Sequence, residues 1–71
     1  MRIVRLKEVM AMTGLSRSTI YERMSMDEFP ANVNLGGSAV GWLESEVCEW
    51  IDSRVRLRDS RLNKPLYSKS L

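Results

Sequence analysis

Residues 16–23 gather, within little more than two helical turns, side chains that can bind an anion or the edge of a nucleic-acid base. They are Ser16, Arg17, Ser18, Thr19, Tyr21, Glu22 and Arg23. An arginine can pair with a phosphate or with O6 and N7 of guanine, a hydroxyl can donate to a phosphate oxygen, and a carboxylate can accept from N4 of cytosine. This combination of residue types favours double-stranded DNA as a partner, if one element presents them together.

Two short helices and the turn between them are the elements that would hold this segment in place. The apolar side of the first helix consists of Leu6, Val9, Met10 and Thr13. Their spacing predicts a helix over residues 6–12, and Gly14 supplies the left-handed residue that ends it. Ser16 then caps a second helix over residues 17–24. Two helices joined in this way are typical of a helix-turn-helix that reads DNA.

The second helix can be oriented by placing Ile20 towards the core. At about 100° per residue, Ser18 and Glu22 then lie at the centre of the outward face. The long side chain of Arg17 starts beside the buried side and can extend to solvent. A helix of about eight residues is about 12 Å long, which fits a major groove about 12 Å wide. The edges of the outward face carry Thr19, Tyr21 and Arg23.

Glu22 and Tyr21 each allow two interpretations. Phosphates would repel the carboxylate of Glu22, so this side chain either accepts from cytosine or is a solvated acid paired with a neighbour. The ring of Tyr21 either brings its hydroxyl group to a phosphate or lies over the core as an aromatic lid. The sequence leaves both alternatives open.

A small β-hairpin is predicted after the second helix. Apolar residues alternate with polar or small residues over residues 32–35 and again over residues 39–42. The connection between the two segments consists of Gly36, Gly37 and Ser38. Alternation on both sides of a glycine-rich connection is the usual signal for a hairpin.

The predicted organisation is one domain over residues 1–58 and a flexible polar tail over residues 59–71. Helical spacing with acids early and arginines late begins at Glu44 and predicts a third helix that ends near Arg58. Residues 3–4 form an apolar pair that can add an edge strand. The predicted core consists of Leu6, Val9, Met10, Leu15, Ile20, Met24, Phe29, Val33, Leu35, Val40, Trp42, Val47, Trp50 and Ile51. In this core, Trp42 and Trp50 clamp the hairpin onto the third helix. The predicted fold class is therefore mainly α with a small β-hairpin.

Composition limits the remaining classes of function. The 71 residues contain one cysteine, Cys48, and no histidine, so neither a metal site nor a Cys/His nucleophile has the partners it needs. We therefore expect no enzyme activity, no cofactor and no small-molecule substrate. No apolar run approaches the roughly 20 residues of a membrane span, and an unpaired cysteine fits a reducing compartment. We expect a cytoplasmic protein without membrane contact.

Charge is distributed unevenly along the chain. The net charge is +3 over residues 1–25, −6 over residues 26–53 and +5 over residues 54–71. Basic ends favour a polyanionic partner. A plain helix with an acidic start and a basic finish has the same pattern, so this distribution alone does not distinguish the two interpretations.

Two segments, RLKEVMAMTGLSRSTIYERM and FPANVNLGGSAVGWLESEVCEWI, together with the residues between them, resemble the AlpA family of small prophage-encoded transcriptional regulators. This family lies in the MerR-like, excisionase-like group of winged helix-turn-helix proteins, and the resemblance covers residues 3–57. It implies binding to promoter or attachment-site DNA and control of genes such as a neighbouring integrase. It also implies that residues 16–19 and Tyr21 face the groove and that the hairpin is a wing with its tip at Gly36, Gly37 and Ser38.

Two positions depart from similar sequences, which commonly carry a basic residue where this chain has Ser38 and directly after the tyrosine, where it has Glu22. These departures keep open a protein-interaction module, such as an antirepressor, whose acidic middle binds another regulator. Within DNA binding, the alternative is an excisionase-type factor that bends attachment-site DNA. We predict a non-enzymatic DNA-binding regulator with its second helix in the major groove. Because one short helix contacts few base pairs, we expect a homo-oligomer or a cooperative array on DNA.

Overall fold

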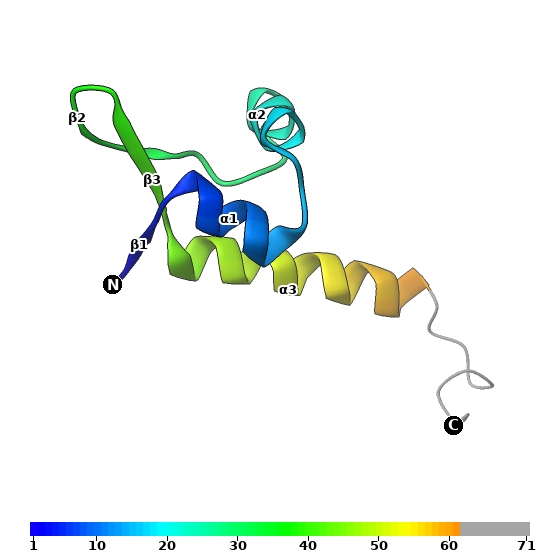
Figure 1. The fold of residues 1–71 in the computed structure, drawn as a ribbon. Helices are drawn as coiled ribbons and strands as arrows, with labels where there is room; N and C mark the ends of the chain where they lie inside the picture. The colour runs from blue at the N-terminus through cyan, green and yellow to red at the C-terminus, as the bar shows by residue number, and fades with distance from the viewer. Residues whose placement is uncertain (62–71) are drawn as a thin grey trace.

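The computed structural model describes residues 1–61 as three helices and a three-stranded sheet. In chain order the elements are β1 (Ile3–Val4), α1 (Leu6–Thr13), α2 (Arg17–Ser25), β2 (Val33–Gly36), β3 (Ala39–Leu43) and α3 (Glu44–Arg61) (Figure 1). The predicted fold, mainly α with a small β-hairpin, is confirmed. Helix α2 and the hairpin of β2 and β3 lie along one side of the molecule, and α3 runs along the opposite side (Figure 1).

A glycine turn and a serine cap form the corner between α1 and α2. Gly14 has a φ of 75° and donates its N–H to the carbonyl oxygen of Met10 at 2.8 Å, so α1 ends at Thr13, one residue later than predicted. A side chain at this φ would strain the backbone. Ser16 is extended, and its Oγ accepts the backbone N–H of Thr19 at 3.2 Å. The predicted turn and cap are confirmed.

The central strand of the sheet is β3, which pairs antiparallel with both other strands. Strand β1 pairs with β3 so that Val4 lies opposite Trp42, and β2 pairs with β3 so that Val33 lies opposite Gly41. The predicted edge strand at residues 3–4 and the predicted hairpin are both confirmed. Pairing with β1 places the chain start next to the beginning of α3.

Gly41 lies where both neighbouring strands approach β3 closely. A Cβ at this position would lie 2.5 Å from Cγ2 of Ile3, 3.1 Å from the carbonyl oxygen of Val4 and 3.2 Å from Cδ1 of Leu35. We expect Gly41→Ala to lower the free energy of unfolding by about 1–2 kcal/mol, because Ile3 and Leu35 would have to shift. Urea unfolding measures this change. A variant as stable as the natural chain would contradict this prediction, because it would show that β1 and β2 can move away from β3 without a loss of stability.

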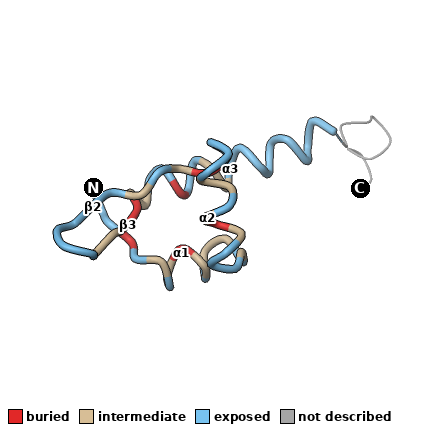
Figure 2. The backbone as a smooth tube through the Cα atoms, turned by 90° about the horizontal axis from the view of Figure 1, so that it is seen from above, coloured by how far each residue is buried: buried red, intermediate tan, exposed pale blue. Residues whose placement is uncertain are grey.

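The core lies between the sheet and the three helices (Figure 2). Its buried residues are Val4, Val9, Ile20, Phe29, Trp42 and Val47. Partly buried around them are Leu6, Met10, Met12, Leu15, Tyr21, Met24, Val40, Trp50 and Ile51. The predicted core is confirmed except at Val33 and Leu35, which are 38% and 43% exposed. Both lie on β2, an edge strand whose four residues are all exposed, and alternation alone does not show whether an apolar strand face is covered.

The side chains of Trp42 and Trp50 fix the connection between α2 and β2. The indole N–H of Trp42 donates to the carbonyl oxygen of Pro30 at 3.0 Å, and that of Trp50 donates to the carbonyl oxygen of Glu28 at 2.9 Å. The ring of Phe29 packs edge-on against Trp50, with 4.8 Å between centroids. The sequence indicated both tryptophans as core residues that clamp the hairpin onto the third helix. Their hydrogen bonds show that they also hold this connection.

Helix α3 continues through Arg61, the last described residue, so the predicted helix end near Arg58 is wrong. No glycine or proline interrupts residues 44–61, and arginines near the end of the helix interact favourably with its dipole. The second half of α3 extends beyond the core and is exposed (Figure 2). Residues 62–71 of the predicted tail lie outside the described residues. Within residues 1–61, no helix is long and apolar enough to cross a membrane.

Arg2 connects the start of the chain to two helices. Its guanidinium donates to Glu8 of α1 at 2.9 Å and to Glu44 at the start of α3. The hydrogen bonds to Glu8 and Glu44 raise the pKa of Arg2 above its ordinary value, so its charge is constant at any physiological pH. Because the arginine is exposed, these ion pairs orient the elements more than they stabilise the fold.

Candidate nucleic-acid interface

The first turn of α2 carries three hydroxyl groups around its cap. The Oγ of Ser16 donates to Oγ1 of Thr19 at 2.9 Å while it accepts the N–H of Thr19. The Oγ of Ser18 lies 3.4 Å from that of Ser16. Ser16 is therefore occupied by the cap, whereas Ser18 and Thr19 can still donate to a ligand. No acid lies in this turn, so the helix dipole and the free N–H groups favour an anion here.

The cap makes a testable contribution to the stability of α2. We expect Ser16→Ala to lower the free energy of unfolding by about 1 kcal/mol, because the N–H of Thr19 loses its acceptor. Ser18→Ala is the matched control, since Ser18 is exposed and does not cap a backbone group. Thermal unfolding of the two variants measures the difference. Equal stability of the two variants would contradict the assignment of Ser16 as the cap.

The ring of Tyr21 connects the side chain of Arg17 to the core. The ring of Tyr21 is half-buried and packs edge-on against the buried Trp42, with 6.2 Å between centroids. The guanidinium carbon of Arg17, which is exposed, lies 5.6 Å from the centroid of the Tyr21 ring. The alternative of an aromatic lid is thus confirmed for Tyr21, and a contact from its hydroxyl group stays a prediction. The stacking restricts Arg17 before it meets a ligand.

Glu22 and Arg23 lie in different surroundings. Glu22 is exposed, and its carboxylate forms no ion pair or hydrogen bond with any described residue, so no neighbour neutralises it. Arg23 is half-buried and lines a groove with Leu15 and with Ile51 of α3. Its aliphatic stem therefore leans towards α3 and away from the centre of the outward face. Contacts of either residue with DNA stay predictions.

The hairpin of β2 and β3, which we call the wing, has an exposed and uncharged tip. Gly36, Gly37 and Ser38 are all exposed, and no charged residue occurs over residues 33–40. The side-chain oxygen of Asn34 accepts the N–H of Gly36 at 2.7 Å, which directs the carboxamide of Asn34 along the tip. Asn34 was not among the predicted site residues. An asparagine two residues before a glycine is a turn signal that could have indicated this position.

A helix-turn-helix whose second helix lies beside an exposed hairpin defines a winged helix-turn-helix protein. Within residues 1–61, no group of three or more His, Cys, Asp or Glu residues is placed to hold a metal ion. The family model described as prophage CP4-57 regulatory protein (AlpA) matches residues 2–55. The chain therefore belongs to the AlpA family, which consists of regulatory proteins.

Two curated relatives support this membership. A protein of Enterobacteria phage P4, described as the uncharacterized protein ORF88, is 54% identical over 54 residues, which cover 76% of this chain and 61% of that protein. The DNA-binding transcriptional activator AlpA of Escherichia coli K12 is 39% identical over 62 residues, which cover 79% of this chain and 89% of that protein. The match to the phage protein thus leaves more than a third of its length without a counterpart.

Proposed function

We propose that this protein is a sequence-specific, DNA-binding transcriptional regulator of prophage or mobile-element genes that acts in the cytoplasm. The observation that carries the proposal is the capped start of α2, where Arg17, Ser18 and Thr19 lie at the surface around free N–H groups. The description of the E. coli relative as a DNA-binding transcriptional activator supports it. Neither a cofactor nor a small-molecule substrate is required for this function.

Helix α2 would enter the major groove with its N-terminal turn facing the bases. Arg17 would pair with a guanine, and Ser18 and Thr19 would donate to phosphates on one side of the groove. The wing lies on the same side of the molecule as α2 (Figure 1). Because its tip carries no charge, it would contact DNA only through Ser38, Asn34 and backbone N–H groups.

Several copies would be needed to select one genomic site. A helix of nine residues reaches few base pairs, and each correct base pair supplies only about 1–3 kcal/mol of discrimination. We therefore expect cooperative binding, with protected sites repeated at multiples of about 10 bp.

Gel-shift and footprinting experiments with DNA that flanks the protein's own gene test the proposal. We expect a saturable, sequence-specific shift that unrelated DNA of equal length does not compete away. Absence of any specific shift would favour the protein-interaction module instead. A specific shift with a large bend, but without an effect on transcription of the bound promoter, would favour the excisionase-type factor.

A further inference from the structure

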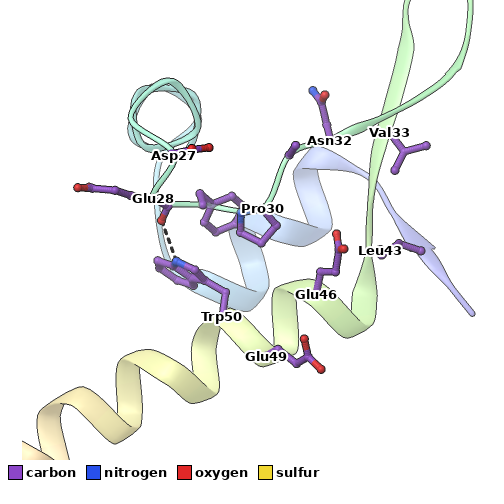
Figure 3. Close-up of a pocket in the computed structure, with 11 residues that line it drawn as sticks. Asp27, Glu28, Pro30, Asn32, Val33, Leu43, Glu46, Glu49 and Trp50 are labelled. Atoms are coloured by element: carbon purple, nitrogen blue, oxygen red, sulfur yellow. Dashed lines mark hydrogen bonds between the residues drawn. The ribbon is translucent and has the colours of Figure 1, made fainter.

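A groove with acidic residues in its lining begins directly after the C-terminal end of α2. It lies between residues 27–33 and the first half of α3 and has a volume of about 660 Å³ (Figure 3). Phe29 and Trp50 form part of its apolar lining. Its lining also includes Asp27, Glu28, Glu46 and Glu49; the Glu46 carboxylate points towards the segment of residues 27–33, whereas the Glu28 carboxylate points away from the groove (Figure 3). We call this feature the acidic groove.

The carboxylates of the acidic groove have no positive partner in the described part of the chain. The ion pairs there involve other acids, and no lysine or arginine lines the groove. Acidic residues without basic neighbours in this lining favour a positively charged ligand. DNA, which has the same sign of charge, cannot be that ligand. The groove therefore fits a segment that is both basic and apolar.

The second half of α3 has this chemistry. It carries Arg54, Arg56, Arg58 and Arg61, and it extends past the core (Figure 2). Leu57 lies among these arginines and is 56% exposed. Within residues 1–61, Arg56 pairs with Asp52, Arg58 pairs with Asp59 and Arg54 lies over the ring of Trp50. The exposed side chains of Leu57 and Arg61 are the ones that can meet another molecule.

Acidic and basic ends of α3 also share one face of the helix. At about 100° per residue, Glu46, Trp50, Leu57 and Arg61 fall within an arc of about 60°. Along this face the order is acid, aromatic, aliphatic and base. The face is therefore complementary to itself when a second copy of the helix runs in the opposite direction.

We propose that the acidic groove of one copy receives the second half of α3 from a second copy, in a reciprocal antiparallel pair. With Trp50 opposite Leu57 of the second copy, the same four-residue step places Glu46 opposite Arg61 of the second copy. Two-fold symmetry repeats both contacts. The pair buries Leu57 in the groove, brings the Glu46 carboxylate to an arginine, and does not involve the first turn of α2 or the tip of the wing.

This inference rests on the proposed function in one respect, because the interface would supply the contact between copies on DNA. Dimerisation itself can be tested without DNA. Sedimentation equilibrium of the full chain measures the dimer dissociation constant at low salt. We expect Glu46→Lys and Arg61→Glu each to raise that constant at least about tenfold, because like charges then meet twice in each pair. Both side chains are exposed, so the variants should fold as the natural chain does.

An equimolar mixture of the two variants gives the decisive result. In a mixed pair, Glu46 of one variant meets Arg61 of the other at one end, and the two substituted side chains, again of opposite charge, meet at the other end. We therefore expect a dissociation constant within about threefold of the natural value. Glu22→Lys, which makes the same charge change on α2, is the matched control and should leave dimerisation unchanged.

Three results would overturn the interface: a monomeric natural chain, equal weakening by Glu46→Lys and Glu22→Lys, or a mixture that stays dissociated. Assemblies longer than dimers would overturn the reciprocal arrangement. A chain that is monomeric but binds DNA specifically would remove this inference and leave the proposed function intact. A dimer without specific DNA binding would support this interface and contradict the proposed function.

Discussion

Specific DNA binding is expected to weaken by about 60- to 500-fold when the salt concentration rises from about 50 mM to about 200 mM. Each phosphate that a lysine or arginine neutralises releases counterions, and the slope of log K against log salt is about −0.9 per phosphate. Contacts with roughly three to five phosphates give a slope of about −3 to −4.5. Gel shifts or fluorescence anisotropy across this salt range measure the slope.

The basic groups that can supply these contacts belong to two regions of the chain. Arg5 at the N-cap of α1, Lys7 in α1 and Arg17 in the first turn of α2 are exposed. The arginines of the second region belong to α3, whose second half extends past the core (Figure 2). DNA binding through α2 predicts that Arg56→Gln, a variant of α3, leaves the slope unchanged. Lys7→Gln tests whether Lys7 contacts a phosphate, in which case the slope becomes less steep. An affinity that does not depend on salt would contradict DNA binding.

The corner between α1 and α2 could be predicted from the sequence because its determinants are local. Gly14 needs only a positive φ, and Ser16 needs only the backbone three residues ahead, so both act within one turn of their own position. The helical periodicity of residues 17–24 also predicted which side chains surround the cap. For Tyr21 the periodicity gave only its place on the helix, and the choice between a lid and a hydroxyl contact stayed open because it depends on packing against Trp42 of β3.

The sequence could not predict features that depend on which element covers another. Val33 and Leu35 alternate as core residues do, but their strand lies at the edge of the sheet and stays exposed. The lean of Arg23 towards α3 depends on how close the two helices pack. The acidic groove also escaped prediction, although the net charge of −6 over residues 26–53 was its signal. Its acids come from two segments that only the fold brings together.

Replacing Arg17 by alanine is expected to weaken specific DNA binding by about 5- to 150-fold, which corresponds to about 1–3 kcal/mol. Arg17 is the exposed arginine in the first turn of α2, and its stacking on Tyr21 holds the planar guanidinium where it can form two hydrogen bonds with one guanine. Loss of these bonds would lower binding to the specific site more than binding to unrelated DNA. Titrations of both DNAs with the natural chain and the variant measure the difference.

Two further variants separate base recognition by Arg17 from a charge effect or a structural role. Arg17→Lys keeps the charge but cannot form the paired hydrogen bonds, so it should lose most of the specificity while its salt dependence stays the same. Arg56→Ala removes a similarly exposed arginine from α3 and should bind as the natural chain does. The exposed stacking on Tyr21 contributes only about 0.5–1 kcal/mol, so Arg17→Ala should remain folded. If Arg17→Ala instead unfolds while its folded fraction binds with natural affinity, the residue is structural and another side chain of α2 must read the site.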